Sequence, residues 1–184
     1  MKRLLSVLTT TMLVILPAFG QQVPDTGYAP PIENPAYALK EGPLIYIDEV
    51  HNNFHTRGGR YLPFAMLLER DGYVTDGYAG QFEMSKLKNC RILVIANALS
   101  EVNVRNWHKP VDSAFTPDEV ETVREWVEEG GSLFLIADHM PMGGAATEMA
   151  AAFGSGLLTV SPLTQCSPDR HFFAQLTAPW ETMY

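Results

Sequence analysis

Short apolar runs recur along the middle of the chain, and they have the length of β-strands. The sequence predicts strands at 44–47, 73–78, 91–97 and 133–137, with a fifth at 157–160. The run 91–97, R-I-L-V-I-A-N, is apolar at successive positions. Both of its faces would therefore be buried, which is typical of a central strand in a parallel sheet covered by helices on both sides.

The segments between these strands predict helices. Apolar residues at helical spacing predict a helix over about 60–70, which Gly72 would end. The polar link 81–89 contains one helical turn. An Ala- and Met-rich stretch predicts a further helix over about 144–153, and Gly154 would stop it.

The clearest helix signal begins at Thr116. This residue can cap the helix, Pro117 suits the first helical position, and Glu119 completes a capping box. Its predicted buried stripe consists of Val120, Val123, Trp126 and Val127, and the pair Gly130-Gly131 ends the helix.

Alternating strands and helices predict one α/β domain over 44–184, with an open, mostly parallel sheet. A proline-rich stretch at 21–43 precedes it and predicts an extended lead-in, which Tyr28 and Tyr37 would pin to the domain. The pattern decays after about residue 160 without a terminating element. We therefore expect the domain to be incomplete there and the natural chain to continue beyond Tyr184.

The first residues predict a signal peptide. Lys2 and Arg3 precede an apolar stretch at 4–16, and Ala18 and Gly20 are small residues of the kind a signal peptidase requires. The apolar stretch is shorter than the roughly 20 residues needed to span a bilayer. We expect export to the periplasm or the extracellular space, cleavage near Gly20, and no membrane span in the mature chain.

Composition narrows the choice of partners. The formal charge is −8, and loss of Lys2 and Arg3 with the signal peptide would take it to −10. An acidic domain without a Lys/Arg stripe is poorly suited to a phosphate backbone, so nucleic acid is not an expected partner. Export would allow the two cysteines, Cys90 and Cys166, to pair, and two unpaired thiols are the alternative.

Polar side chains collect where the predicted strands end. The first strand leads into D-E-V-H-N-N-F-H at 48–55, the third ends at Asn97, and the fourth leads into Asp138 and His139. Open α/β sheets bind ligands outside the carboxyl ends of their strands. With a flavodoxin-like strand order, the first, third and fourth strands would be neighbours, and these side chains would share one site.

This cluster has three possible interpretations. In the first, it binds a divalent metal (zinc, manganese or iron) that activates water. Its candidate ligands are Asp48, His51, His55, Asp138 and His139, although their spacing matches no established motif such as HExxH.

The second interpretation is metal-free acid/base chemistry, in which Asp48 or Asp138 orients His51 or His139 as the general base. In the third, the aspartates cap loops through backbone amides and the histidines bridge strands. A cluster of this size favours a site over that third, purely structural interpretation.

Two glycine pairs, Gly58-Gly59 and Gly143-Gly144, each stand between a polar strand end and a helix start. Their amides could face an anion, although such pairs are also ordinary turn formers. The other candidates for ligand binding are Glu49, Asn52, Asn53, Arg60 and Asn97.

The segments I-D-E-V-H-N-N-F-H, W-V-E-E-G-G-S-L-F-L-I-A-D-H-M-P and G-G-A-A resemble an exported bacterial family without an assigned reaction, placed in the class I glutamine amidotransferase-like superfamily. The resemblance covers about residues 43–160 and implies a flavodoxin-like three-layer sandwich and export. Amidotransferases of that superfamily carry a cysteine nucleophile after the strand that here leads into Asp138-His139. Since this chain has no cysteine there, glutamine hydrolysis by the usual triad is not expected.

Together these observations predict a hydrolase site that acts on a small polar or saccharide-like substrate. His51 or His139 would be the base, Asp48 and Asp138 would orient it or hold a metal, and the Gly143-Gly144 amides would stabilise developing negative charge. The alternative is a non-catalytic ligand-binding or scaffolding module of the cell envelope with the same fold.

Overall fold

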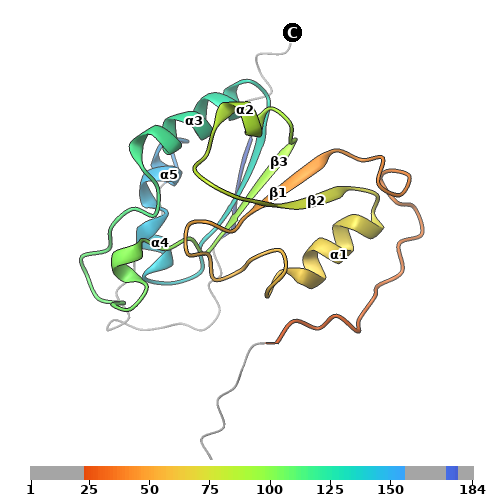
Figure 1. Ribbon diagram of the computed structural model, residues 1–184, viewed down its shortest axis with the longest axis horizontal. Coiled ribbons are helices and arrows are strands. Elements are labelled where there is room, and N and C mark those ends of the chain that lie inside the picture. Colours follow the sequence, from red (N-terminus) through yellow and green to blue (C-terminus); the bar gives the residue numbers. More distant parts are fainter. Residues whose placement is uncertain (1–22, 156–172, 178–184) are drawn as a thin grey trace, which may run out of the picture.

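A single five-stranded sheet organises the computed structural model, which describes residues 23–155 and 173–177 (Figure 1). Its strands are β1 (Leu44–Asp48), β2 (Val74–Tyr78), β3 (Ile92–Ala96), β4 (Ser132–Ile136) and β5 (Phe173–Thr177). They lie in the order β2-β1-β3-β4-β5. The first four run parallel, and β5 pairs antiparallel with β4. This is the flavodoxin-like order, so the predicted fold class is confirmed.

Helices lie on both faces of the sheet. Figure 1 shows α1 (Leu62–Arg70) on one side and α2 (Met84–Leu87), α3 (Pro117–Glu128) and α5 (Thr147–Ala151) on the other. The short α4 (Met142–Ala145) leads directly into α5, and a 3₁₀ turn (Glu101–Asn103) lies in the loop after β3. The described residues thus form three layers.

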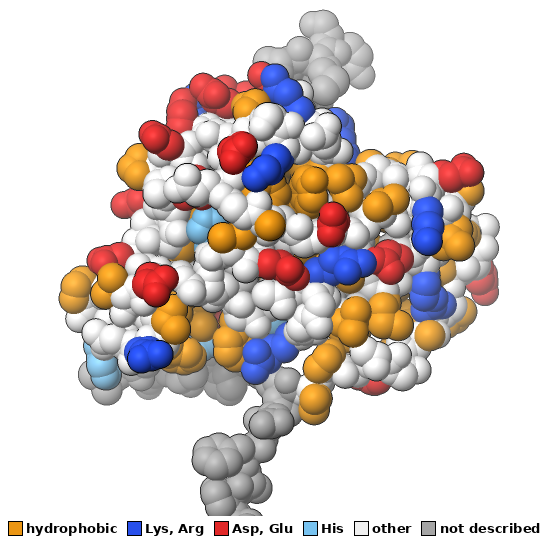
Figure 2. Space-filling model, in the orientation of Figure 1, with side chains coloured by type: hydrophobic (Ala, Val, Ile, Leu, Met, Phe, Trp, Pro, Cys, Tyr) orange, Lys and Arg blue, Asp and Glu red, His pale blue; other side chains and the backbone are white. Residues whose placement is uncertain are grey.

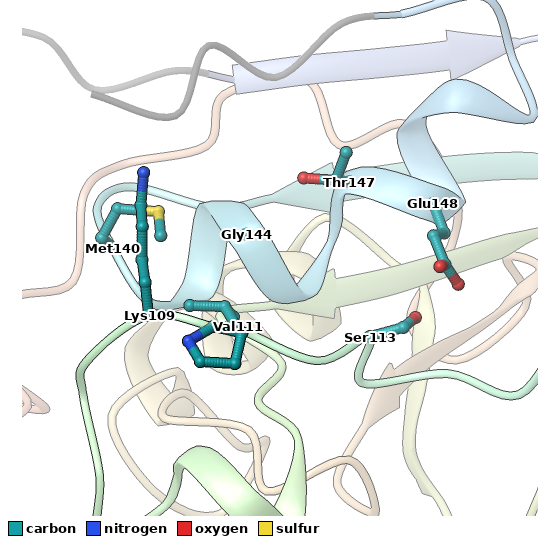
Figure 3. Close-up of a pocket in the computed structure, with 8 residues that line it drawn as sticks. Lys109, Val111, Ser113, Met140, Gly144, Thr147 and Glu148 are labelled. Atoms are coloured by element: carbon teal, nitrogen blue, oxygen red, sulfur yellow. The ribbon is translucent and has the colours of Figure 1, made fainter. Parts of the chain in front are cut away.

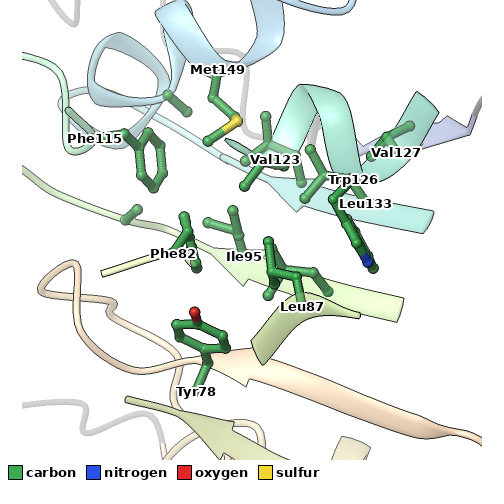
Figure 4. Close-up of a cluster of buried hydrophobic side chains, with 14 of the residues drawn as sticks. Tyr78, Phe82, Leu87, Ile95, Phe115, Val123, Trp126, Val127, Leu133 and Met149 are labelled. Atoms are coloured by element: carbon green, nitrogen blue, oxygen red, sulfur yellow. The ribbon is translucent and has the colours of Figure 1, made fainter. Parts of the chain in front are cut away.

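The core consists of two apolar clusters, one on each face of the sheet. On β3, Leu93 and Ile95 face one cluster, and Val94 and Ala96 face the other. This alternation follows from the two-residue repeat of a β-strand. Figure 4 shows the larger cluster, in which side chains of the sheet meet those of α2, α3 and α5. As predicted, β3 is buried on both faces.

Capping fixes the start of α3. The Thr116 hydroxyl accepts a hydrogen bond from the Glu119 amide (3.3 Å), and the Glu119 carboxylate accepts one from the Thr116 amide (2.9 Å). Gly130, at φ 103°, follows the last turn in a conformation that favours glycine. The predicted capping box and helix end are both confirmed.

The predicted helix over 144–153 is in fact two short helices that meet at Ala146. The Ala145 carbonyl, which a continuous helix would pair with the amide four residues later, instead accepts from the Ala114 amide (3.0 Å). A long-range backbone contact therefore interrupts the helix, and the local sequence gave no sign of it.

The structure describes only some of the residues after 155 for which predictions were made. The strand predicted at 157–160 lies outside the described residues. No element was predicted after about residue 160, where the pattern decays, and the structure has β5, whose residues Phe173–Thr177 pair with the edge of β4. The expected incompleteness of the domain stays a prediction. Cys166 also lies outside the described residues, so its predicted pairing with Cys90 stays a prediction.

The lead-in is held by Tyr37. Its ring packs edge-on against Tyr73 with centroids 5.0 Å apart, and its amide donates to the Asp71 carbonyl (3.1 Å). Gly72 permits this contact, because a Cβ there would lie 2.2 Å from the Tyr37 carbonyl oxygen. Tyr28 is 72% exposed and does not anchor the chain as predicted.

We expect Leu93→Ala to lower the free energy of unfolding by about 2–5 kcal/mol, because Leu93 is fully buried at the centre of the sheet. Leu39→Ala is the matched control, since Leu39 is 70% exposed on the lead-in. Urea denaturation of both variants would test this, and equal losses would contradict the assigned core.

Candidate functional site

The carboxyl ends of β1, β3 and β4 lie side by side, since β3 pairs with both of the other strands. The chain changes direction across the sheet between β1 and β3, and such a switch point is where open α/β sheets bind ligands. The polar residues predicted to converge do lie at this edge. They form two groups with different environments.

The first group, which we call the buried triad, consists of Asp48, His51 and Glu119. His51 Nδ1 lies 3.0 and 2.9 Å from the two carboxylate oxygens of Asp48. His51 Nε2 lies 3.0 Å from Glu119 Oε1. All three side chains are nearly or fully buried.

Its geometry favours a protonated His51. Ionised carboxylates only accept hydrogen bonds, so an imidazole between two of them is satisfied when both ring nitrogens carry protons. Burial lowers the pKa of His51, but hydrogen bonds and charge from Asp48 and Glu119 outweigh it, and the net shift is upward. Burial likewise raises the pKa of Glu119, but hydrogen bonds from Thr116 and His51 bring it below its ordinary value.

Every carboxylate oxygen of the triad has further donors. Asp48 accepts from the Val50 amide (3.3 Å) and the Asn53 side chain (2.9 Å), and Glu119 accepts from the Phe82 amide (3.2 Å). The rings of Phe82 and Phe115 lie 4.8 and 4.9 Å from His51. This enclosure suits a structural ion cluster. It does not suit the predicted role of His51 as general base, because neither ring nitrogen is available to a substrate.

The second group, which we call the edge chain, runs through His55, Asn97, Asp138 and His139. Asn97 Nδ2 lies 3.2 Å from His55 Nδ1, and Asn97 Oδ1 accepts from the Asp138 amide (3.1 Å). The Asp138 carboxylate pairs with His139 Nδ1. A continuous hydrogen-bonded chain therefore crosses the ends of β1, β3 and β4.

The edge chain is accessible, unlike the triad. The side chain of His139 is 55% exposed and that of Asp138 is 30% exposed. Burial raises the pKa of Asp138, but the hydrogen bond and charge of His139 outweigh it, so the carboxyl stays ionised at neutral pH. Burial lowers the pKa of His55; the charge of Asp138 opposes this shift and the charge of Arg60 adds to it, and the net shift is downward. His55 is therefore neutral and carries one ring proton. Since its Nδ1 accepts a hydrogen bond from the Asn97 side chain, that proton is on Nε2.

Aromatic rings line the edge chain. Tyr61 lies 4.6 Å from the His55 ring, and Trp107, which is 48% exposed, lies 5.8 Å from the His139 ring. Trp107 belongs to the long loop after β3. Asn103 holds that loop, with its side-chain amide donating to the carbonyls of Asn106 (3.0 Å) and Pro110 (3.2 Å).

Most other predicted ligand-binding residues stabilise turns. Asn53 Oδ1 accepts from the His51 amide (3.0 Å), and Asn52 donates to the Leu99 carbonyl (3.1 Å). Glu49 accepts from the Arg57 amide (2.7 Å), and Arg60 lies over the Phe54 ring at 3.9 Å. These contacts order the segment between β1 and α1.

Three of the four predicted glycine amides are already engaged. Gly58 donates to Glu49 (3.4 Å), Gly59 to the Thr56 carbonyl (3.1 Å), and Gly143 to the His139 carbonyl (2.9 Å). Gly144 instead permits close packing, since a Cβ there would lie 2.9 Å from the Val111 side chain. The structure therefore offers no support for an oxyanion site at either pair.

The five candidate metal ligands are divided between the two groups. Asp48 and His51 belong to the buried triad, and His55, Asp138 and His139 belong to the edge chain. Within 23–155 and 173–177, no three histidine, cysteine or acidic side chains are arranged to hold a metal ion. A metal at this edge is therefore not favoured by the arrangement of the described side chains.

Sequence reasoning missed the second role of Glu119, which was predicted only as a capping residue. Its partner His51 is 68 positions away in the chain, so spacing gave no signal. Tyr61, at the N-cap of α1, packs against the apolar cluster on that face of the sheet, and its ring also contacts His55.

On the face seen in Figure 2, basic side chains are scattered among acidic ones. Among the described residues, no helix has the length and apolar character needed to cross a bilayer. No family model matches the chain, and a search of curated proteins finds no relative.

His51→Ala is expected to lower the free energy of unfolding by about 3–5 kcal/mol, because it leaves the buried Asp48 and Glu119 carboxylates without their cation. His108→Ala is the matched control: His108 is exposed, and its described hydrogen bonds use its backbone. The control should change stability by less than about 0.5 kcal/mol. Similar stability of both variants in urea would contradict the triad.

The triad also predicts how stability depends on pH. Because the folded-state pKa of His51 is raised, its contribution is fully present below its unfolded value of about 6.5 and is lost as pH rises through the folded pKa. The difference in unfolding free energy between the wild type and His51→Gln should therefore shrink above about pH 6.5. Urea titrations at several pH values would measure it, and a difference that grows with pH would exclude a protonated His51.

Proposed function

We propose that the protein is a hydrolase that acts on a small polar or saccharide-like substrate, with the edge chain as its acid/base site. The observation that carries this proposal is the Asp138–His139 pair, a carboxylate hydrogen-bonded to an exposed imidazole at the carboxyl end of β4, the strand next to the switch point between β1 and β3. We further propose that the protein is exported, on the pattern of its first 20 residues, and that it belongs to the amidotransferase-like superfamily it resembles.

His139 acts as the general base. Asp138 holds Nδ1–H and thereby leaves the Nε2 lone pair for a proton of water. The water oxygen attacks the scissile carbon while one of its protons passes to Nε2. The bond between that carbon and the leaving group then breaks, and the leaving group takes the proton from Nε2, which regenerates the neutral base. Asp138 stays ionised throughout and stabilises the imidazolium that forms.

His55 complements this base. Its neutral ring carries a proton on Nε2, so it can donate a hydrogen bond to the substrate oxygen on which negative charge develops. Asn97 joins His55 to Asp138 and fixes their relative positions.

Water is the nucleophile in this scheme, in agreement with the cysteine chemistry of the described residues. Cys90 is buried and donates to the Leu87 carbonyl (3.3 Å). Burial raises the pKa of its thiol to about 12, so no thiolate forms at neutral pH.

We expect the purified protein to turn over at least one member of a panel of p-nitrophenyl esters and p-nitrophenyl glycosides. In His139→Ala, kcat/KM should fall by about 100-fold to 10,000-fold, the usual contribution of a general base. His108→Ala, which removes an exposed histidine from the neighbouring loop, should retain wild-type kcat/KM.

Turnover that survives His139→Ala would overturn the assignment of the base. Absence of turnover on the whole panel, together with saccharide-dependent changes in the NMR spectrum, would favour the alternative of a non-catalytic ligand-binding module.

A further inference from the structure

A cavity of about 300 Å³ lies beside the edge chain (Figure 3). One wall is the loop segment 109–113, and the other is the segment from Met140 through Glu148. Met140 directly follows His139, and Trp107, which contacts His139, lies two residues before Lys109. The cavity therefore adjoins the proposed base, and its volume suits a small molecule.

Both walls of the cavity are fixed by contacts within the fold. The Ala114 amide donates to the Ala145 carbonyl (3.0 Å), which ties the loop to the helical segment. The Asn103 side chain also holds this loop, because it donates to the Pro110 carbonyl (3.2 Å). A preformed cavity binds a ligand without first ordering its own walls, which favours affinity.

The cavity has opposite charges at its two ends. Figure 3 shows Lys109 and Met140 at one end and Ser113 and Glu148 at the other, with Val111 between them. Among the described side chains, neither Lys109 nor Glu148 forms an ion pair. Between the charges, Val111 and Met140 contribute apolar surface to the cavity.

This pattern of charge specifies a ligand. A carboxylate beside Lys109 and an ammonium beside Glu148 would each meet an opposite charge, and an apolar spacer would contact Val111 and Met140. A dicarboxylate would place one negative charge beside Glu148, and a diamine would place one positive charge beside Lys109. A small zwitterion is the class that satisfies both ends.

We propose that the cavity binds a small zwitterion, with its carboxylate at Lys109 and its amine at Glu148. The further statement that this ligand is the substrate rests on the hydrolase proposed above. It narrows the small polar substrates of that proposal to those that carry both charges across an apolar spacer.

The test is binding of 6-aminohexanoate to the purified full chain, followed by amide chemical shifts and calorimetry. We expect shift changes at 109–113 and 140–148, and weaker binding of hexanoate and hexylamine, which each lack one charge. Lys109→Met and Glu148→Gln should each weaken binding by about twofold to fivefold, the loss expected for one ion pair of exposed side chains. Lys88→Met is the matched control, because Lys88 is exposed on another part of the surface, where it pairs with Glu129.

If 4-aminobutyrate, 6-aminohexanoate and 8-aminooctanoate all fail to bind, or if Lys109→Met binds as well as the wild type, the inference is overturned. Binding does not depend on turnover, so the two proposals can fail separately. Zwitterion binding without hydrolysis would support the proposed ligand of the cavity and refute the hydrolase. Hydrolysis without zwitterion binding would support the hydrolase and refute the proposed ligand.

Discussion

The ion cluster of Asp48, His51 and Glu119 is the constraint on which the ligand-binding edge depends. Burying an imidazolium is unfavourable unless its charge and both of its protons are satisfied. Here the two carboxylates come from the end of β1 and from the first turn of α3. The hydrogen bonds of His51 to both carboxylates therefore fix these two elements relative to each other. The turn after β1 is fixed with them, because Asn53 also donates to Asp48.

Because of this constraint, the polar residues of one sequence segment have two different roles. The segment 48–55 looks like a single cluster, but His51 is enclosed by Phe82 and Phe115, whereas His55 reaches Asn97 at the accessible edge. Burial of the first histidine orders the turn that presents the second. Residues that would compete for a ligand or a metal in an open site are thus kept apart.

The elements that could be predicted from the sequence are those whose signals lie at neighbouring positions in the chain. Apolar runs predicted β1 to β4, and Thr116 with Glu119 predicted the start of α3, because these signals involve neighbouring positions. Partners distant in the chain could not be predicted. The pairing of His51 with Glu119, and the contact of Ala114 with the Ala145 carbonyl at the end of α4, can be recognised only once the fold is known. The convergence of strand ends was predicted from topology, whereas which histidine would be buried depended on side chains contributed by α3 and its flanking segments.

Asn97 joins the scaffold to the edge chain. It has a positive φ of 51°, which asparagine tolerates better than most residues, and all of its polar groups are used. Its backbone bonds the Ile136 carbonyl (2.8 Å) and the Phe54 amide (3.1 Å), while its side chain bonds His55 and the Asp138 amide. One residue therefore transmits the geometry of β3 to both neighbouring strand ends. Because the triad and the edge chain meet only through such backbone and turn contacts, the groups that stabilise the fold and the groups proposed for chemistry are physically distinct.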